Sequence, residues 1–325
     1  MTEQAAQTVA SRLALVTGAA GFIASHITRA LLQQGWAVRA MDDLSGGLGW
    51  SRLADEKESR LSRITGSILD AIALAEAVKG VDVIVHHAAM VSVPESVAKP
   101  ITYHQVNATG TLMVLEAARR AGVKKIIYAS TSAAYGDDPQ QPKVESMLPQ
   151  PMSPYAVSKY AGERYVSAYA ALHGMATVSL RYFNVFGPGQ NPRSQYGAAI
   201  PSIVTKMLQG QRPTIYGDGE QTRDFCSIDN VVNANLLAIE SDVLKGQTLN
   251  IGCGRAITVN QIVKSVNAIL GTQIEADHQP TRPGEVRHSL ADISAARQLL
   301  GYEATVQFDE GLRRALDWYR AQIKI

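Results

Sequence analysis

Short apolar runs alternate with longer stretches of helical periodicity through the first half of the chain. The apolar runs, which are typical of buried strands, lie at 13–17, 36–41, 60–66, 82–87, 124–130 and 176–182, and the helix-like stretches lie at 21–34, 70–79, 101–121 and 154–173. This alternation predicts a parallel sheet covered by helices on both faces. Ligands of such sheets gather beyond the carboxyl ends of the strands.

The first apolar run is followed at once by a glycine-containing turn and a helix-like stretch. Gly18 and Gly21 stand in this turn, and Ala24 stands where a third glycine is often found. Glycines let the backbone approach a pyrophosphate at a helix N-terminus, where free amides favour negative charge. The next apolar run ends at Asp42, about 20 residues after the turn, where a carboxylate accepts hydrogen bonds from an adenosine ribose and repels a 2′-phosphate. The pattern predicts a dinucleotide site that favours NAD over NADP.

The regular alternation ends near residue 185, where turn signals at 187–189, 217–219 and 282–284 become frequent. We therefore expect an α/β fold with a Rossmann-type doubly wound parallel sheet and a smaller C-terminal substrate-binding lobe. The expected boundaries are a disordered tail at 1–10, an NAD-binding domain at 11–184 to which later segments return, and a lobe at 185–325 that mainly binds substrate.

A tyrosine and a lysine stand four residues apart at the start of the stretch 154–173. Ser153 can cap this helix and Pro154 can be its first residue, so Tyr155 and Lys159 lie on one face, about one turn apart. An adjacent ammonium and a helix N-terminus both favour a phenolate, so we expect the pKa of Tyr155 to move from ~10 toward neutrality. The pair then provides a base for alcohol oxidation. The alternative is a half-buried tyrosine beside a solvated lysine.

Composition limits the other classes of function. The chain has 325 residues, 46% of them hydrophobic, and 31 Lys+Arg against 29 Asp+Glu, with no long basic block, so nucleic acid is not an expected partner. No signal-like start and no run of about 18 apolar residues is present, so we expect a cytoplasmic protein without a membrane span. Cys226 and Cys253 lack metal-ligand spacing, and no metal is expected.

Several motifs now stand in a fixed order along the chain. They are the glycine turn with Asp42, His-His-Ala-Ala at 86–89, the segment from Ser130 to Gly136, the Tyr155/Lys159 pair, and the segment from Arg181 to Pro188. Over about residues 11–320 the sequence resembles the extended short-chain dehydrogenase/reductases, and among them the nucleotide-sugar epimerases of the UDP-galactose 4-epimerase type.

This resemblance implies a catalytic triad of Thr131, Tyr155 and Lys159. Thr131 would hydrogen-bond the sugar 4-hydroxyl, Tyr155 would remove its proton, and Lys159 would hold the nicotinamide ribose and keep Tyr155 ionised. Ser130 and Ser132 are the alternatives for the hydroxyl of Thr131. The implied reaction passes hydride from sugar C4 to NAD, lets a 4-keto intermediate rotate about its diphosphate linkage, and returns hydride to the opposite face. Tightly bound NAD is therefore expected, because loss of NADH would strand the ketose.

The resemblance also implies two sets of binding residues. The cofactor set is Gly18, Gly21, Phe22, Ile23, Asp42, Ser67, Ile68, His87, Ala88, Ala89, Asn107, Tyr155, Lys159 and Tyr182, and the substrate set is Val91, Ser132, Asn184, Arg223, Arg282 and Ser289. The guanidinium groups of Arg223 and Arg282 suit bidentate contacts to a diphosphate. Asn107 has the alternative role of a buried amide that supports the sheet.

Several residues differ from those of particular family members, and these differences indicate which reaction and which sugar to expect. Ser132-Ala133 replaces the Asp-Glu of dehydratase relatives, which argues against dehydration. Ser289 stands where enzymes restricted to plain hexoses carry a bulky tyrosine, so it leaves room for an N-acetyl group, whereas Val91 narrows one wall. Ser67 replaces an aspartate that binds adenine in many relatives. The resemblance thus favours a UDP-hexose 4-epimerase that accepts N-acetylated sugars.

The sequence also leaves other activities open and suggests how the protein assembles. A UDP-uronic acid 4-epimerase, a 4-keto nucleotide-sugar reductase and a non-catalytic NAD-sensing module remain as alternatives. By resemblance, the stretches 101–121 and 154–173 would form a four-helix bundle in a homodimer, for which they carry Leu112, Met113, Leu115, Tyr165, Tyr169 and Leu172. The alternative is that these apolar residues belong to the core.

Overall fold

A computed structural model describes residues 12–56, 59–191, 199–281 and 286–322. Its largest sheet has seven parallel strands in the order β11-β6-β5-β4-β1-β2-β3. In chain order they are β1 (Leu13–Thr17), β2 (Ala37–Asp42), β3 (Leu61–Thr65), β4 (Val83–His86), β5 (Lys125–Thr131), β6 (Ala176–Tyr182) and β11 (Gln247–Ile251). Six of these strands confirm the predicted runs, and β11 joins the sheet from the second half of the chain.

Helices cover both faces of this sheet, as predicted. One face packs on α1 (Phe22–Gln33), α8 (Ile228–Glu240) and α10 (Ser294–Leu300), and the other on α2 (Ala71–Ala77), α5 (Gly110–Ala121) and α6 (Pro154–His173). Each face has its own cluster of buried apolar side chains. The two clusters account for the stability of a doubly wound fold, because both faces of every central strand leave water.

The connections carry several short helices. They are η1 (Ser51–Leu53), α3 (Val93–Ala98), α4 (Pro100–His104), η2 (Gln105–Thr109) and η3 (Ser132–Tyr135). The stretch predicted as one helix at 101–121 is α4 and α5 joined by η2, a π-helical turn that contains Asn107. π-helical turns of this kind are frequent at functional sites.

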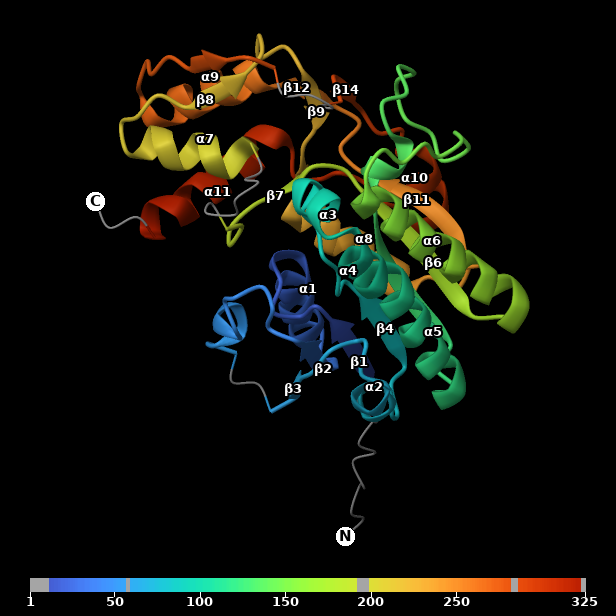
Figure 1. Ribbon diagram of the computed structural model, residues 1–325. Coiled ribbons are helices and arrows are strands. Elements are labelled where there is room, and N and C mark those ends of the chain that lie inside the picture. Colours follow the sequence, from blue (N-terminus) through green and yellow to red (C-terminus); the bar gives the residue numbers. More distant parts are fainter. Residues whose placement is uncertain (1–11, 57–58, 192–198, 282–285, 323–325) are drawn as a thin grey trace.

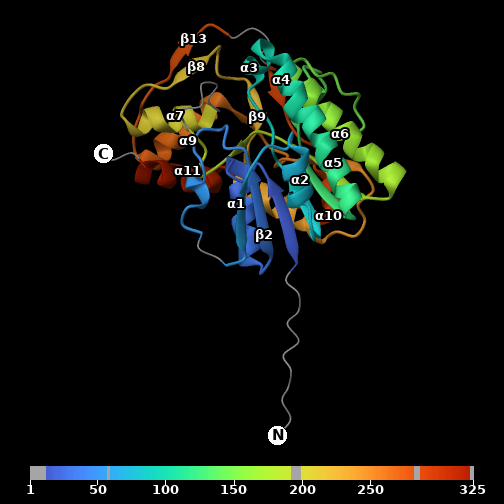
Figure 2. The ribbon, with the colours of Figure 1, turned by 60° about the horizontal axis from the view of Figure 1, so that its bottom comes forward.

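The remaining elements form a C-terminal lobe with a third apolar cluster. Its helices are α7 (Ala199–Leu208), α9 (Val259–Leu270) and α11 (Phe308–Gln322), and its short strands pair as β7 (Val185–Phe186) with β10 (Cys226–Ser227), β8 (Thr214–Tyr216) with β13 (Asp277–Gln279), and β9 (Thr222–Asp224) with β12 (Ala256–Thr258) and β14 (His288–Ser289). Figures 1 and 2 show α7, α9 and α11 on one flank of the molecule and α5 beside α6 on the other. Within the described part of the chain, no helix combines the length and apolar character that a membrane crossing requires.

Helix α6 begins as the sequence predicts. The Ser153 hydroxyl accepts a hydrogen bond from the Ala156 amide at 3.2 Å, and Pro154 occupies the first helical position. Gly174 ends the helix with φ 65°, a left-handed conformation that costs glycine little. These end signals fix where Tyr155 and Lys159 enter the structure, on the first turns of a helix that packs on β5 and β6.

Candidate active site

The predicted site residues meet at one edge of the large sheet. Because all seven strands are parallel, their carboxyl ends lie at the same edge. Gly18 follows β1, Asp42 ends β2, Ser67 follows β3, His87, Ala88 and Ala89 follow β4, Thr131 ends β5 and Tyr182 ends β6. The fold thus gathers residues more than 160 positions apart in sequence along a single line.

The glycine turn is packed too closely for larger residues. Gly18 has φ 69°, and a Cβ atom there would lie 2.7 Å from the Ala88 nitrogen. The Gly21 amide donates to the Gly18 carbonyl at 2.9 Å, and Gly21 precedes α1 without any side-chain cap. The first amides of α1, at Phe22 and Ile23, therefore have no side-chain acceptor from the capping residue. This turn fits a dinucleotide diphosphate, which approaches the backbone and accepts hydrogen bonds from such amides.

Asp42 lies beside this turn. Its carboxylate accepts hydrogen bonds from the Ala20 amide at 3.0 Å and the Leu44 amide at 2.7 Å. Burial raises the pKa of Asp42, and the two backbone hydrogen bonds oppose the rise. Arg52, which sequence reasoning missed, donates to the Ala20 carbonyl at 3.1 Å and to the Gly189 carbonyl. No motif marks Arg52, since it comes from a short helix with no regular pattern around it.

Three further predicted cofactor residues line the neighbouring wall. The Ser67 hydroxyl accepts from the Leu69 amide at 3.2 Å, and Ile68 is buried against Gly110, where a Cβ atom would lie 2.6 Å from the Ile68 Cδ1 atom. The Asn107 amide group accepts from the Met90 amide and donates to the Met90 carbonyl and the Ser158 hydroxyl. Asn107 therefore ties the loop after β4 to α6, which is the supporting role named as its alternative.

Thr131 is the hydroxyl that meets Tyr155. The Thr131 side chain is close enough to the Tyr155 phenol to lower its pKa, and the Thr131 hydroxyl accepts from the Ala133 amide at 3.1 Å. The Ser130 hydroxyl instead donates to the Glu163 carboxylate at 2.9 Å. Ser132 is the first residue of η3. Of the three candidate hydroxyl groups, the structure brings Thr131 to Tyr155 and assigns Ser130 to a buried ion pair.

The expectation for the Tyr155 pKa is wrong in this structure. Burial raises the pKa of Tyr155, and the hydrogen bond with Thr131 only partly offsets this. Lys159 is itself 3% exposed, and burial lowers its pKa to about 7. Desolvation disfavours both charged forms, the phenolate of Tyr155 and the ammonium of Lys159.

Lys159 packs on an aromatic ring rather than in water. Its ammonium nitrogen lies 4.3 Å from the ring centroid of Tyr128, a residue of β5. One turn later on α6, Glu163 pairs with Arg181 of β6 at 2.6 Å, with both side chains 2% exposed. The charge of Glu163 opposes the lowering of the Lys159 pKa. The alternative of a solvated lysine is thereby excluded.

His87 and Tyr182 form a polar chain at the same edge. The His87 Nε2 atom lies 2.9 Å from the Tyr182 hydroxyl, which also accepts from the Asn235 amide at 2.8 Å. Burial lowers the pKa of His87 to about 3, with the charge of Lys159 as the second cause. Among the described atoms, the buried Nδ1 of His87 has no hydrogen-bond partner. Asn235 was not expected from the sequence, where it is one polar residue in the apolar pattern of α8.

The predicted substrate residues are divided between the loops after strands of the large sheet and the strands of the C-terminal lobe. Arg223 of β9 pairs in register with Ser289 of β14, and its guanidinium donates to the Thr222 and Arg287 carbonyls. Asn184 is exposed between β6 and β7, and Val91 is 69% exposed after β4. Arg282 lies outside the described residues, as does the predicted tail at 1–10.

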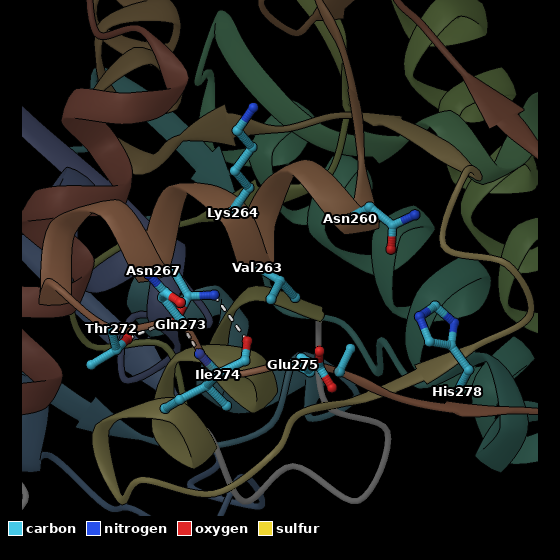
Figure 3. Close-up of a pocket in the computed structure, with 10 residues that line it drawn as sticks. Asn260, Val263, Lys264, Asn267, Thr272, Gln273, Ile274, Glu275 and His278 are labelled. Atoms are coloured by element: carbon cyan, nitrogen blue, oxygen red, sulfur yellow. Dashed lines mark hydrogen bonds between the residues drawn. The ribbon is translucent and has the colours of Figure 1, made fainter.

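A cavity of about 670 Å³ lies away from this edge, between α9 and the segment 272–278 (Figure 3). Asn267 bridges its two sides, because its amide donates to the Ile274 carbonyl at 2.9 Å and accepts from the Ile274 amide at 2.8 Å. None of the residues that line it belongs to the predicted cofactor or substrate sets. Its shape is explained by the packing of one loop on one helix, and it contributes nothing to the site.

Metal ligands do not gather at the site within the residues that the structure describes. There, no group of three or more His, Cys, Asp or Glu side chains is placed to hold a metal ion. Cys226 is buried and Cys253 is partly buried, and both are free thiols. The groups at the sheet edge are instead hydroxyls, backbone amides and one buried ammonium.

The carboxyl edge of the sheet holds a glycine turn, an aspartate at the end of a strand, and a threonine, a tyrosine and a lysine close together. This combination defines a Rossmann-type, dinucleotide-binding enzyme of the short-chain dehydrogenase/reductase class. The NAD dependent epimerase/dehydratase family matches residues 14–252. The chain therefore belongs to this family, which confirms the resemblance and the fold class expected from the sequence. The predictions of an enzyme, of NAD as its cofactor and of nucleotide-sugar epimerase chemistry are confirmed at the level of this family.

Individual relatives match the chain over nearly its whole length. The UDP-glucose 4-epimerase of Mycolicibacterium smegmatis is 35% identical over 94% of this chain and 98% of its own. The structure of a UDP-N-acetylglucosamine 4-epimerase from Methanobrevibacter ruminantium, in complex with UDP-N-acetylmuramic acid, has a TM-score of 0.92 with 37% identity and covers 96% and 99% of the two chains. A UDP-glucuronic acid 4-epimerase from Bacillus cereus, with UDP-glucuronic acid and NAD, has a TM-score of 0.88 with 34% identity over 95% and 99%.

Proposed function

We propose that this protein is an NAD-dependent UDP-hexose 4-epimerase that accepts N-acetylated sugars. The observation that carries the proposal is the position of the Thr131 side chain beside Tyr155, one helical turn before the buried Lys159. This group lies at the same sheet edge as the Gly18 turn and Asp42. An alcohol carbon of a sugar can therefore be held between a proton-transferring hydroxyl pair and a dinucleotide.

Two residues of the chain, Thr131 and Tyr155, would bind the sugar 4-hydroxyl and transfer its proton. Thr131 accepts or donates a hydrogen bond at that hydroxyl, and Tyr155 takes the proton and later returns it. Because burial raises the Tyr155 pKa, the phenolate forms only while Lys159 is an ammonium ion close by. When bound, NAD supplies the redox capacity at C4 and recovers it within the same cycle.

Cofactor choice rests on the turn and on Asp42. The space that a Cβ atom at Gly18 would fill is taken by the Ala88 backbone, so the turn stays close to the sheet edge as a dinucleotide requires. The carboxylate of Asp42, held by two backbone amides, suits a ribose with free hydroxyls and repels a 2′-phosphate. We infer NAD that stays bound through the cycle, held by the cofactor set named from the sequence.

Substrate choice rests on the C-terminal lobe. Arg223 and Arg282 would anchor the diphosphate with help from Asn184, which leaves the sugar free to turn between its two faces. Ser289 is next to Arg223 across the β9–β14 pair, so a small side chain there leaves space beside the anchor. The similarity to a UDP-N-acetylglucosamine 4-epimerase supports an acetylated sugar.

Two other activities share this site. A UDP-uronic acid 4-epimerase is supported by the similarity to the enzyme that binds UDP-glucuronic acid, since the same triad serves that sugar. A 4-keto nucleotide-sugar reductase would consume its reduced cofactor, and Asp42 argues against the NADPH usual in reductive synthesis. The non-catalytic NAD-sensing module has least support, because the chain keeps all three proposed catalytic residues. Thr131 lies beside Tyr155, and Lys159 follows Tyr155 by one turn of α6.

We also propose a homodimer in which α5 and α6 pair with their counterparts in a four-helix bundle. Tyr165 is 40% exposed and Leu172 is 74% exposed on α6, which leaves apolar surface for a partner. Leu115 and Tyr169 are buried, and Leu112 and Met113 pack on the core beneath the helices, so these four belong to the core alternative. A cytoplasmic location remains a prediction from the sequence.

The direct test incubates the purified protein, without added cofactor, with UDP-N-acetylglucosamine, UDP-glucose and UDP-glucuronic acid in parallel. Chromatography then separates the C4 epimers. We expect epimers of UDP-N-acetylglucosamine and UDP-glucose, and a loss of about 10³-fold or more in Tyr155→Phe because the proton-transferring group is removed. Turnover of UDP-glucuronic acid alone would favour the uronic acid enzyme, and consumption of added NADH or NADPH would favour the reductase.

A further inference from the structure

The burial of Lys159 needs a compensating interaction. The side chain is 3% exposed, so its ammonium has left most of its hydration behind. A buried ammonium persists only where nearby groups replace the lost water. The ring face of Tyr128, with its centroid 4.3 Å from the Lys159 nitrogen, is in position to do so, because the face of an aromatic ring carries negative potential.

Tyr128 is fixed in place at both ends. It is fully buried on β5, and its hydroxyl donates to the Lys159 carbonyl at 3.1 Å. Tyr128 therefore contacts one lysine twice, at its backbone carbonyl through the hydroxyl and at its ammonium through the ring face. Gly162, one turn further along α6, makes this possible, since a Cβ atom there would collide with the Tyr128 hydroxyl. The sequence Lys159-x-x-Gly162 thus leaves α6 open to the aromatic ring beneath it.

Other titratable groups around Lys159 contribute less directly. The groups that face it are His86 and His87 from β4, Tyr128 from β5, and Tyr155 and Glu163 from α6, with Arg181 of β6 behind Glu163. Burial lowers the pKa of both histidines, so they are neutral near pH 7. The charge of Glu163 is shared with Arg181, which donates two hydrogen bonds to it at 2.9 and 2.6 Å. Tyr128 is left as the group in face-on contact with the ammonium.

We propose that Tyr128 is a positioning residue for Lys159: its ring face holds the side chain beside Tyr155 and stabilises the ammonium form. The inference rests on the proposed function, because it assigns Tyr128 a role in keeping the proton-transferring pair charged. Tyr128 acts only through Lys159, and its hydroxyl is engaged by the helix backbone.

The test compares Tyr128→Leu, which removes the ring, with Tyr128→Phe, which keeps it. Protein labelled with ¹³C at lysine Cε is titrated by NMR, and the Lys159 signal is identified by its loss in Lys159→Met. In Tyr128→Leu we expect the Lys159 pKa to fall by roughly one and a half pH units, the size of a desolvated cation–π contact. Tyr128→Phe should titrate as the wild type does.

Enzyme kinetics give the second readout. The ammonium form is lost as the pH rises through the Lys159 pKa, so a lower pKa moves the alkaline limb of kcat toward lower pH in Tyr128→Leu. Tyr319→Leu is the matched control, since Tyr319 is buried too, at 2% exposed, but it lies on α11 and its hydroxyl donates to the Gln190 carbonyl. The Tyr319→Leu variant should be less stable than the wild type, and the alkaline limb of its kcat profile should stay at the wild-type pH.

The outcomes separate the two proposals. If Tyr128→Leu lowers stability while the Lys159 titration and the alkaline limb stay at the wild-type position, Tyr128 is only a core residue and the inference is overturned. The titration needs no turnover, so it decides the role of Tyr128 even if the protein epimerises none of the sugars tested. Absence of epimers from the wild type would instead count against the proposed function.

Discussion

At the scale of single residues, the chemistry of the site depends on burial as much as on residue type. Spacing alone placed Tyr155 and Lys159 on one helix face, and the Ser153 cap made that placement predictable. Their pKa values were not predictable, because a sequence does not show that Lys159 is enclosed at 3% exposure. Tyr128 comes from β5 and Asn235 from α8, and neither stands in a motif with the residue that it contacts, so neither carried a signal in the sequence.

Thr131 offers a sharp test among three neighbouring hydroxyl groups. We expect Thr131→Ala to lower kcat by about 10²-fold or more, because the contact at the sugar hydroxyl and at Tyr155 is lost, whereas Thr131→Ser should retain most activity. Ser130→Ala is the matched control. It removes a hydrogen bond to Glu163 and should affect stability more than kcat. Equal losses in Thr131→Ala and Ser130→Ala would contradict the assignment.

His87 predicts how stability depends on pH. Its pKa of about 3 in the folded protein is below the unfolded value of ~6.5, so the unfolded chain binds more protons between these values. Stability is therefore lost as the pH falls below ~6.5, by up to about 2 kcal/mol at pH 5 from this residue. Urea unfolding at pH 7 and pH 5 should show a smaller loss for His87→Gln than for the wild type. An equal loss in both proteins would show that His87 can be charged while folded.

At the scale of elements, the sequence predicted most of the sheet and little of what packs around its edge. The six strands from β1 to β6 and the helices α1, α2 and α6 lie within about two residues of their predicted bounds, because apolar runs and caps mark them clearly. Strand β11 was missed since Gln247–Ile251 has mixed polarity, and its place beside β6 depends on α8. Helix α3 was missed because six residues give too short a pattern.

The turn between β1 and α1 should lose its ability to bind NAD when a single methyl group is added at Gly18. We expect Gly18→Ala to lower the NAD content of the purified protein by about tenfold or more, because it adds a clash with Ala88 to the strain of a left-handed backbone. Gly122→Ala is matched to it, with φ 75° and open space around the added carbon. That control should lose roughly 1–2 kcal/mol of stability and keep its NAD. Absorbance after denaturation measures the cofactor, and equal NAD in both variants would contradict the proposed turn.

At the scale of the whole molecule, two lobes and two flanks have separate tasks. The edge of the large sheet holds Thr131 and the glycine turn, and the C-terminal lobe brings Arg223 and Ser289 on paired strands. The opposite flank carries α5 and α6 (Figure 2), where α6 supplies Tyr155 and Lys159 from its first turns and exposes Tyr165 and Leu172. The sequence could suggest this division, since the alternation ends near residue 185, but not which apolar helix residues stay exposed.

Assembly through that flank is tested by adding charge. We expect Tyr165→Glu combined with Leu172→Glu to give a monomer in sedimentation velocity, where the wild type is a dimer, because buried carboxylates without partners are costly. Ile72→Glu is the control, since Ile72 is 80% exposed on α2, which is not one of the two helices of the proposed bundle. A wild-type monomer, or a dimer that survives both charges, would contradict the four-helix bundle.

The central claim is that the site oxidises and re-reduces the same sugar carbon within one cycle. UDP-N-acetylglucosamine or UDP-glucose carrying deuterium at C4 tests it, with the product analysed by mass spectrometry and NMR. The account predicts that the C4 epimer keeps its deuterium at C4 and that no added cofactor is consumed. Loss of the label to water, or conversion of one cofactor molecule for each sugar, would contradict it.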